Sequence, residues 1–224
     1  MFQGLFQAKK RWIAVAATIL IAAAVLTVFQ EQTRSLEAEA ARLAELLALE
    51  PGMTVGEVGG GSGEMSIQMA RHVGPTGHVF VNELDAERLD EIHETVAESA
   101  AQNITVIEGS ADDTHLPAAC CDAIYMRRVY HHLTDPQEIN ASLFRALRPG
   151  GRLAVIDFAP DQAIFFVRWF AERPEGVSED RGGHGVPRRI VSEELAEAGF
   201  QQERVIPDWS GAPFSPHFCV LFRR

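Results

Sequence analysis

The chain has 224 residues, of which 46% are hydrophobic and 23% are charged, and its formal net charge is −11. This length suits one α/β domain with a short appendage, and the composition is that of a globular protein rather than a disordered one. The acidic balance argues against a dedicated nucleic-acid-binding protein, because a phosphate backbone requires a basic face.

The N-terminal segment, residues 1–34, differs in composition from the rest of the chain. Lys9-Lys10-Arg11 precedes an apolar run from Trp12 to Phe29. As a helix this run is about 27 Å long, which is close to the thickness of the hydrocarbon core of a bilayer. We therefore predict a signal anchor that crosses a membrane through residues 12–29, which implies a single-pass protein of the bacterial inner membrane. A cleaved signal peptide followed by export, and a buried helix of a soluble protein, are the alternatives.

From residue 35 onward the hydrophobic pattern alternates between short strands and amphipathic helices. The expected strands are residues 53–58, 78–83, 103–109, 122–129, 152–158, 203–209 and 217–224, and the expected helices are residues 35–49, 64–73, 86–101, 135–147 and 192–198. This alternation is typical of an α/β fold with a doubly wound, mostly parallel, Rossmann-like sheet. No helical stretch separates the last two strands, so we expect them to form a C-terminal antiparallel pair.

The three cysteines, Cys120, Cys121 and Cys219, have no CxxC spacing. On a strand, the adjacent Cys120 and Cys121 would point to opposite faces. We therefore predict no metal site and expect reduced, buried thiols.

A glycine-rich loop, EVGGGSG at residues 57–63, follows the first strand of the predicted sheet. A turn of this kind lets the backbone approach a ligand closely and directs N–H groups toward it. Dinucleotide-binding folds require G-x-G-x-x-G, whereas Gly59, Gly61 and Gly63 give G-x-G-x-G, and Glu64 stands where the third glycine would be. A carboxylate there opposes pyrophosphate binding, and the absence of G-K-[ST] excludes a P-loop.

Acidic residues lie at the carboxyl ends of three successive strands. Glu57 ends the first strand, Glu83 ends the second, and Asp112 and Asp113 follow the third. Open α/β sheets bind their ligands at this edge.

The glycine loop resembles the E/D-x-G-x-G-x-G signature of class I S-adenosylmethionine-dependent methyltransferases. VYHHLTDP at residues 129–136 and LRPGGRLAVIDF at residues 147–158 are similar to segments of the ubiquinone/menaquinone-type, small-molecule enzymes of that family. The resemblance is close over residues 36–158 and looser from residue 185 to 224. Arg127-Arg128 departs from the family pattern, and one of these arginines is a candidate for an anionic group of the cofactor or substrate.

The resemblance implies S-adenosylmethionine as the cofactor and a site for it at the acidic edge. Glu83 would accept from the ribose hydroxyls, and Asp112 would accept from the adenine amino group, with Asp113 as a rival. The implied cofactor-binding residues are Glu57, Gly59, Gly61, Gly63, Glu83, Asp112 and Asp113.

Methyl transfer requires a general base only when the acceptor loses a proton. His131 and His132 follow the fourth strand at the ligand edge, and we predict a catalytic role for one of them. Asp157 is a weaker candidate, and Tyr130 is a candidate for the pocket wall. Residues 161–187, which contain His184 and an aromatic run at residues 165–170, are a candidate substrate lid.

The predicted function is transfer of a methyl group by in-line displacement to a small acceptor, for which a lipophilic molecule is one option. The predicted domain comprises residues 35–224. The alternatives are a nicotinamide-dependent oxidoreductase and a non-catalytic S-adenosylmethionine-binding protein. One conflict stays open: Lys9-Lys10-Arg11 predicts a cytosolic N-terminus and an external domain, whereas the cofactor is made in the cytosol.

Overall fold

A computed structural model of the chain describes residues 33–159, 185–209 and 217–224. The predicted membrane segment at residues 12–29 and nearly all of the predicted lid at residues 161–187 lie outside the described residues. Among the helices that are described, none is both long and apolar enough to cross a bilayer. Residues from Ala41 onward belong to one unit, and the fold below is that of this unit.

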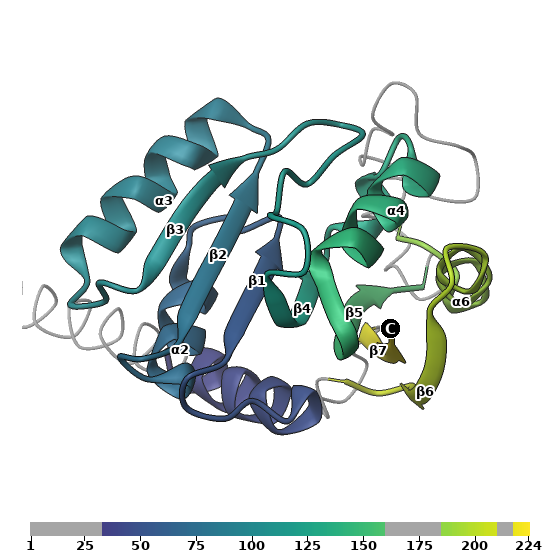
Figure 1. Ribbon diagram of the computed structural model, residues 1–224, viewed down its shortest axis with the longest axis horizontal. Coiled ribbons are helices and arrows are strands. Elements are labelled where there is room, and N and C mark those ends of the chain that lie inside the picture. Colours follow the sequence, from purple (N-terminus) through teal and green to yellow (C-terminus); the bar gives the residue numbers. More distant parts are fainter. Residues whose placement is uncertain (1–32, 160–184, 210–216) are drawn as a thin grey trace, which may run out of the picture. The chain divides into compact units, whose positions relative to one another are not determined.

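The described residues form a single seven-stranded sheet in the order β3-β2-β1-β4-β5-β7-β6 (Figure 1). The strands are β1 (Thr54–Val58), β2 (His78–Glu83), β3 (Ile104–Glu108), β4 (Cys121–Arg127), β5 (Leu147–Phe158), β6 (Gln201–Ile206) and β7 (His217–Arg223). Strands β1 to β5 pair in parallel, and β7 is antiparallel to both β5 and β6. The predicted doubly wound sheet and C-terminal antiparallel pair are confirmed.

Helices precede and connect the strands, and aspartate side chains cap two of them. The helices are residues 33–47, α2 (Glu64–Val73), α3 (Ala86–Glu98), the 3-10 helix η1 (Tyr130–His132), α4 (Pro136–Ala146) and α6 (Arg188–Glu197). Asp85 and Asp135 cap α3 and α4 by accepting the N–H groups of Arg88 and Glu138. Helix α6 begins four residues earlier than predicted, directly after Pro187.

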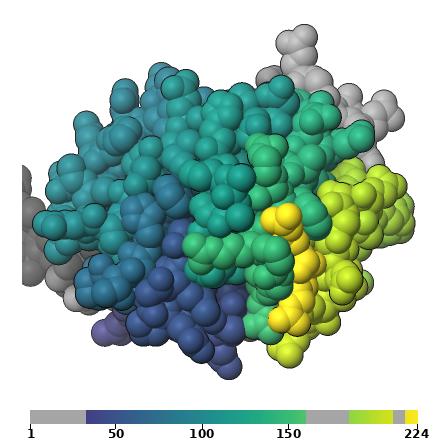
Figure 2. All heavy atoms as spheres, viewed as in Figure 1, coloured from purple at the N-terminus to yellow at the C-terminus, as the bar shows by residue number. Residues whose placement is uncertain are grey.

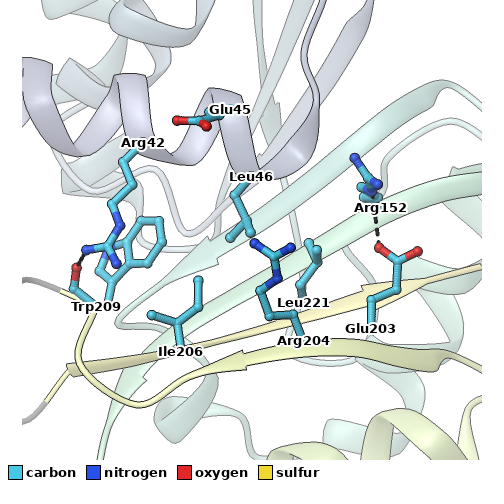
Figure 3. Close-up of a pocket in the computed structure, with 9 residues that line it drawn as sticks. All are labelled: Arg42, Glu45, Leu46, Arg152, Glu203, Arg204, Ile206, Trp209 and Leu221. Atoms are coloured by element: carbon cyan, nitrogen blue, oxygen red, sulfur yellow. Dashed lines mark hydrogen bonds and ion pairs between the residues drawn. The ribbon is translucent and has the colours of Figure 1, made fainter.

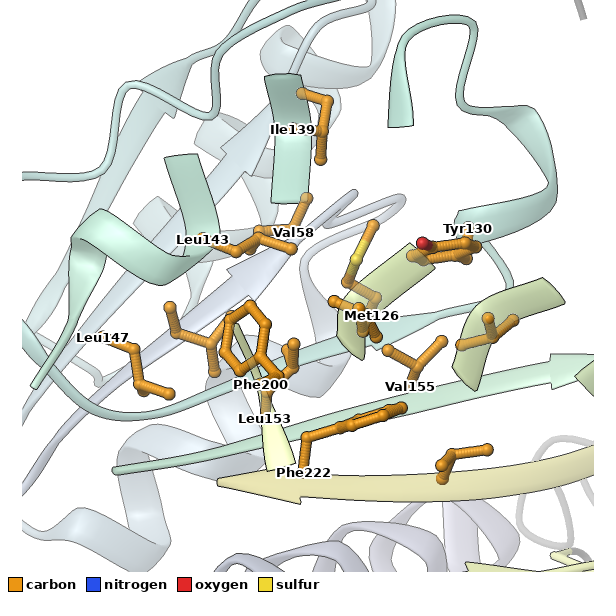
Figure 4. Packing of buried hydrophobic residues seen from close by; sticks show 14 of the residues in the cluster. Val58, Met126, Tyr130, Ile139, Leu143, Leu147, Leu153, Val155, Phe200 and Phe222 are labelled. Atoms are coloured by element: carbon orange, nitrogen blue, oxygen red, sulfur yellow. The ribbon is translucent and has the colours of Figure 1, made fainter. Parts of the chain in front are cut away.

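Helices cover both faces of the sheet, and successive side chains along each strand point to opposite faces. Val58 of β1 packs into the cluster that α4 and α6 form with β4, β5 and β7 (Figure 4). The preceding residue, Glu57, points to the other face and bonds Ser66 of α2. This alternation places a continuous hydrophobic core on the α4–α6 side, with Tyr130, Leu153 and Phe222 fully buried in it.

Strand β7 occupies an interior position although it comes last among the strands in the chain. In Figure 2 the yellow C-terminal residues lie between the green and the lime segments. Arg152 to Phe158 of β5 pair with Arg223 to His217 of β7, and a register shift between Gln202 and Arg204 marks a bulge in β6.

Two local expectations were wrong. Strand β5 begins at Leu147 rather than at residue 152, because Leu147 pairs with Cys121 and the Gly150 N–H donates to the carbonyl of Arg224. Strand β4 begins at Cys121, so Cys120 lies in the preceding turn, and the two cysteines are joined as a disulfide instead of pointing to opposite faces. Cys219 is buried, as expected.

Candidate active site

The glycine loop joins β1 to α2 with a backbone conformation that residues other than glycine rarely adopt. Gly59, Gly61 and Gly63 have φ angles of 76°, 59° and 80°. The N–H groups of Gly59 and Gly60 donate to the carbonyl of Asn82, at 2.9 and 3.0 Å, which fastens the loop to the end of β2.

Two of the glycines are needed because side chains of neighbouring segments approach closely. A Cβ atom on Gly59 would lie 2.3 Å from Cγ2 of Val129, and one on Gly60 would lie 2.3 Å from Cγ2 of Val81. At Gly61, by contrast, the nearest atom would be in the Arg88 guanidinium, 3.7 Å away. The backbone at Gly61 is therefore open to a ligand.

Glu83 ends β2 directly beside the loop and has only 8% of its surface exposed. Its Oε2 accepts the Gly61 N–H at 3.2 Å, and its Oε1 accepts the N–H groups of Leu84 and Asp85 at 2.9 and 3.4 Å. These bonds hold the carboxylate in one orientation. A carboxylate offers about four lone-pair positions, so Glu83 keeps capacity for a ligand hydroxyl.

Glu57 lies beneath the loop and is 1% exposed. Burial raises the pKa of Glu57 to about 7, although the Ser66 and Tyr125 hydroxyls and the charge of Arg127 oppose the rise. In the structure its carboxylate accepts the Ser66 hydroxyl at the start of α2, and its assignment to the cofactor stays a prediction.

The two aspartates after β3 have different environments. Both carboxylate oxygens of Asp113 accept from the Arg145 guanidinium, at 2.9 and 2.7 Å. Partial burial would raise the pKa of Asp113, but bonds from the His115 N–H and from Arg145 outweigh it and lower that pKa. Asp112 is exposed and, within the described part of the chain, accepts only the Ser110 hydroxyl, at 2.6 Å, so it is the more accessible of the two aspartates to a ligand.

His131 forms a buried pair with Asp157, the next-to-last residue of β5. Its Nδ1 lies 2.9 Å from Oδ1 and 3.1 Å from Oδ2 of Asp157. Asp157 is 0% exposed and also accepts the backbone N–H groups of His131 and Phe158, at 3.1 and 2.8 Å. Asp157 was the weaker candidate in the sequence; it lies 26 residues from His131 along the chain, and the pairing of β4 with β5 brings the two together.

Aromatic rings continue from this pair along the carboxyl edge of the sheet. The His131 and His132 rings have centroids 3.9 Å apart, Phe158 lies 4.8 Å from His131, and His217 lies 5.8 Å from Phe158. Partial burial lowers the pKa of His132, and the neighbouring His131 lowers it further. His131 is buried and His132 is exposed.

The Arg127-Arg128 pair lies where β4 ends and the turn to η1 begins. Arg127 is half-buried, and its charge acts on Glu57. Arg128 is exposed, has a φ of 59°, and donates its N–H to the carbonyl of Ile156 at 2.7 Å. This turn aims Val129 at Gly59 and starts η1, which carries His131.

Residues 55–151 match the protein family described as a methyltransferase domain. This match agrees with the similarity of the glycine loop to class I S-adenosylmethionine-dependent methyltransferases. The resemblance seen in the sequence is thereby confirmed, and the cofactor of this class is S-adenosylmethionine.

Curated relatives carry names from quinone biosynthesis. The chain is 29% identical over 110 residues to the ubiquinone/menaquinone biosynthesis C-methyltransferase UbiE of Vibrio cholerae, and this match covers 49% of the chain. The chain spans only 42% of the length of that relative. A demethylmenaquinone methyltransferase of Listeria monocytogenes is 27% identical over 193 residues, covering 78% of this chain and 80% of the relative.

Solved structures share the fold. An S-adenosylmethionine-dependent methyltransferase from Aquifex aeolicus has a TM-score of 0.67 and 23% identity, covering 82% of this chain and 88% of its own. The [4+2]-cyclase SpnF has a TM-score of 0.65 and 16% identity, covering 84% of this chain and 80% of its own. Since a cyclase shares it, the fold alone does not specify methyl transfer, and the chemistry must be argued from the site.

The residues around the loop fit S-adenosylmethionine. Gly61 leaves the backbone open, Glu83 is a fixed and charged acceptor beside it, and Asp112 is an accessible acceptor beyond β3. Carboxylates suit ribose hydroxyls, an adenine amino group and a cationic ligand, and they oppose a phosphate.

Proposed function

We propose that this chain transfers a methyl group from S-adenosylmethionine to a small, planar, apolar acceptor of the quinone type. The observation that carries the proposal is the position of the His131–Asp157 pair at the same sheet edge as the glycine loop and Glu83. A cofactor cradle and a buried proton acceptor thus lie at the carboxyl ends of adjacent strands. The names of the relatives from Vibrio cholerae and Listeria monocytogenes support the class of acceptor.

The chain's own residues would first bind and orient the reactants. The open backbone at Gly61, the Glu83 carboxylate and Asp112 would hold the cofactor. S-adenosylmethionine, when bound, supplies a methyl group that is already activated for transfer. The remaining task of the protein is to align the acceptor within a near-attack distance and to exclude water.

His131 would accept the proton that a quinol-type acceptor loses. The Asp157 carboxylate takes the Nδ1–H bond, which fixes the tautomer and leaves Nε2 as the basic nitrogen. Among the described residues Nε2 has no hydrogen-bond partner, so it is available to the acceptor. Buried Asp157 also stabilises the imidazolium that forms.

The aromatic edge supports a planar acceptor. His132, His131, Phe158 and His217 follow one another with centroid separations of 3.9 to 5.8 Å. Ring faces and edges of this kind attract other aromatic systems. A flat, apolar ring would pack here better than a flexible polar substrate.

The test uses the full-length chain with S-adenosylmethionine and either a reduced demethylquinone or a saturated analogue. We expect S-adenosylhomocysteine and a methylated product to form with the quinol, and neither to form with the analogue. Binding of S-adenosylmethionine without turnover for any aromatic acceptor would support a non-catalytic binding protein. Binding of a nicotinamide cofactor in place of S-adenosylmethionine would support an oxidoreductase.

We also propose that residues 12–29 anchor the chain in a membrane, which would suit a lipophilic acceptor. The apolar length of this run and the preceding Lys9-Lys10-Arg11 support the proposal. Protease treatment of intact and of permeabilised cells tests it and also reports the side. Recovery of the full chain in the soluble fraction after alkaline extraction would contradict an anchor.

A further inference from the structure

A pocket of about 850 Å³ lies between the helix that ends at residue 47 and strands β5, β6 and β7 (Figure 3). Its lining comes from the helix that ends at residue 47, from β5, β6 and β7, and from Trp209: Arg42, Glu45, Leu46, Arg152, Glu203, Arg204, Ile206, Trp209 and Leu221. This volume is within the range of about 300–1,000 Å³ of small-molecule sites.

The pocket has an apolar part and a charged rim. In Figure 3 Leu46 points down from the helix toward Leu221, and Ile206 lies beside them. Trp209, which is 2% exposed, closes one end. The rim carries three guanidinium groups and two carboxylates, a local excess of positive charge in a chain whose net charge is −11.

Two of the three guanidinium groups are held in place by the protein. The Arg42 guanidinium lies over the Trp209 ring, 4.5 Å from its centroid, and donates to the Trp209 carbonyl. Arg152 donates to Glu203, with Nε 3.2 Å from Oε2. Pre-positioned cations of this kind lower the ordering cost of binding an anion.

The third guanidinium, that of Arg204, forms no ion pair or hydrogen bond with any residue that the structure describes. In Figure 3 it points up between Leu46 and Leu221, toward the helix and over the apolar part of the pocket. Arg204 is exposed, and an arginine that lies over apolar side chains without a counter-ion among the described residues is suited to bind the anionic group of a ligand.

We propose that this pocket binds a phosphate-bearing amphiphile. The phosphate would lie on Arg204 and Arg152, and a short apolar chain would cover Leu46, Ile206 and Leu221. A planar guanidinium group can form bidentate hydrogen bonds with two phosphate oxygens, and burial of a hydrocarbon chain against the apolar part of the pocket is favourable.

The site is separate from the glycine loop. Arg152 lies six residues before Phe158 on β5, which is roughly 20 Å along the strand at about 3.3 Å per residue. The pocket therefore reaches toward the amino ends of the parallel strands, while the candidate active site lies at their carboxyl ends. The ligand proposed here is an additional one and is not the methyl acceptor.

The binding experiment measures the fluorescence of Trp209 in the full-length chain. The other two tryptophans are replaced by phenylalanine (W12F and W169F), and the protein is reconstituted in neutral phosphatidylcholine vesicles. Hexyl phosphate is the probe, and hexanol and inorganic phosphate represent its two halves. We expect saturable binding of hexyl phosphate that is at least tenfold tighter than that of either half.

Matched variants assign the binding to the pocket. R204Q should weaken hexyl phosphate about tenfold or more, because one charge-assisted contact is lost. R189Q, which removes an equal charge from the exposed Arg189–Glu193 pair on α6, should leave binding unchanged. L46Q should weaken hexyl phosphate and leave inorganic phosphate unaffected.

The proposal is wrong if hexanol binds as tightly as hexyl phosphate, or if R204Q and R189Q behave alike. Vesicles that contain phosphatidylglycerol then distinguish the source of the ligand. Competition with hexyl phosphate assigns the site to a lipid headgroup, and lack of competition assigns it to a free phosphate ester. Either result supports the site.

Discussion

Nδ1 of His131 lies 2.9 Å from Oδ1 of Asp157, and the carboxylate of Asp157 is completely buried. The same carboxylate accepts two backbone N–H groups, so its position does not depend on the imidazole. The pair is therefore a fixed unit, in which Asp157 positions a histidine that can exchange a proton with an acceptor.

Replacing Asp157 by asparagine should lower kcat for a quinol-type acceptor by about 10²–10⁴-fold, the usual contribution of a positioned general base. The affinity for S-adenosylmethionine, measured by calorimetry, should stay the same because the glycine loop is untouched. H131N should cause a similar loss, and H132N is the comparison variant. A larger loss in H132N than in H131N would assign the proton to the exposed ring.

Replacing Glu83 by alanine should weaken S-adenosylmethionine binding by about 1.5–3 kcal/mol, the cost of a charge-assisted set of hydrogen bonds. E87A is the control, because it removes the same charge from an exposed position in the first turn of α3. Calorimetric titration of both variants gives the answer, and equal dissociation constants would rule out Glu83 as a ligand of the cofactor.

The free energy of unfolding should depend on pH through Glu57. Its pKa rises from 4.5 to about 7 on folding, so the native state binds a proton that the unfolded state has lost. Glu57 therefore costs stability as pH rises from about 4.5 to 7, by roughly 3 kcal/mol in all, and the loss persists above pH 7. E57Q should lack this contribution. Urea unfolding at pH 5, 6, 7 and 8 measures it, and parallel pH profiles for the two proteins would contradict it.

Replacing Gly59 by alanine should destabilise the fold by roughly 2–5 kcal/mol, because the positive φ is strained and the new methyl group meets Val129. Gly150 provides a matched control. It has a φ of 81° and nothing within 4 Å, so G150A should cost only the strain of about 1–2 kcal/mol.

Adding V129A to G59A should recover about 1 kcal/mol or more, since it removes the two Cγ atoms of Val129, which are the nearest atoms to the new methyl group. Thermal and urea unfolding of the four proteins tests the series. If G59A and G150A cost the same, the close contact with Val129 is unimportant.

The order and type of the elements could be predicted from the sequence where local signals were strong. Helix α2 and strand β2 begin and end at the predicted residues, since Gly63 and Gly74 bound the helix and alternation marks the strand. The first residues of β5 could not be predicted, because they depend on partners such as Cys121 and Arg224 that lie far away in the chain.

The same distinction applies to the site. Topology alone places Glu57, Glu83 and Asp112 at or beyond the carboxyl ends of three parallel strands, so their position at one edge of the sheet was predictable. The direction of each side chain was not, because distant residues determine it. Ser66 binds Glu57 beneath the loop, and Arg145 binds Asp113 away from Asp112.

The strand order has a consequence for how the protein folds during its synthesis. Strand β6 is translated before β7, yet β7 is the only strand to which β6 pairs in the described sheet. Until β7 has left the ribosome and paired, the edge of β5 exposes unpaired backbone groups, which are prone to pair with other chains. We expect this interval to be the period in which the nascent protein depends most on chaperones.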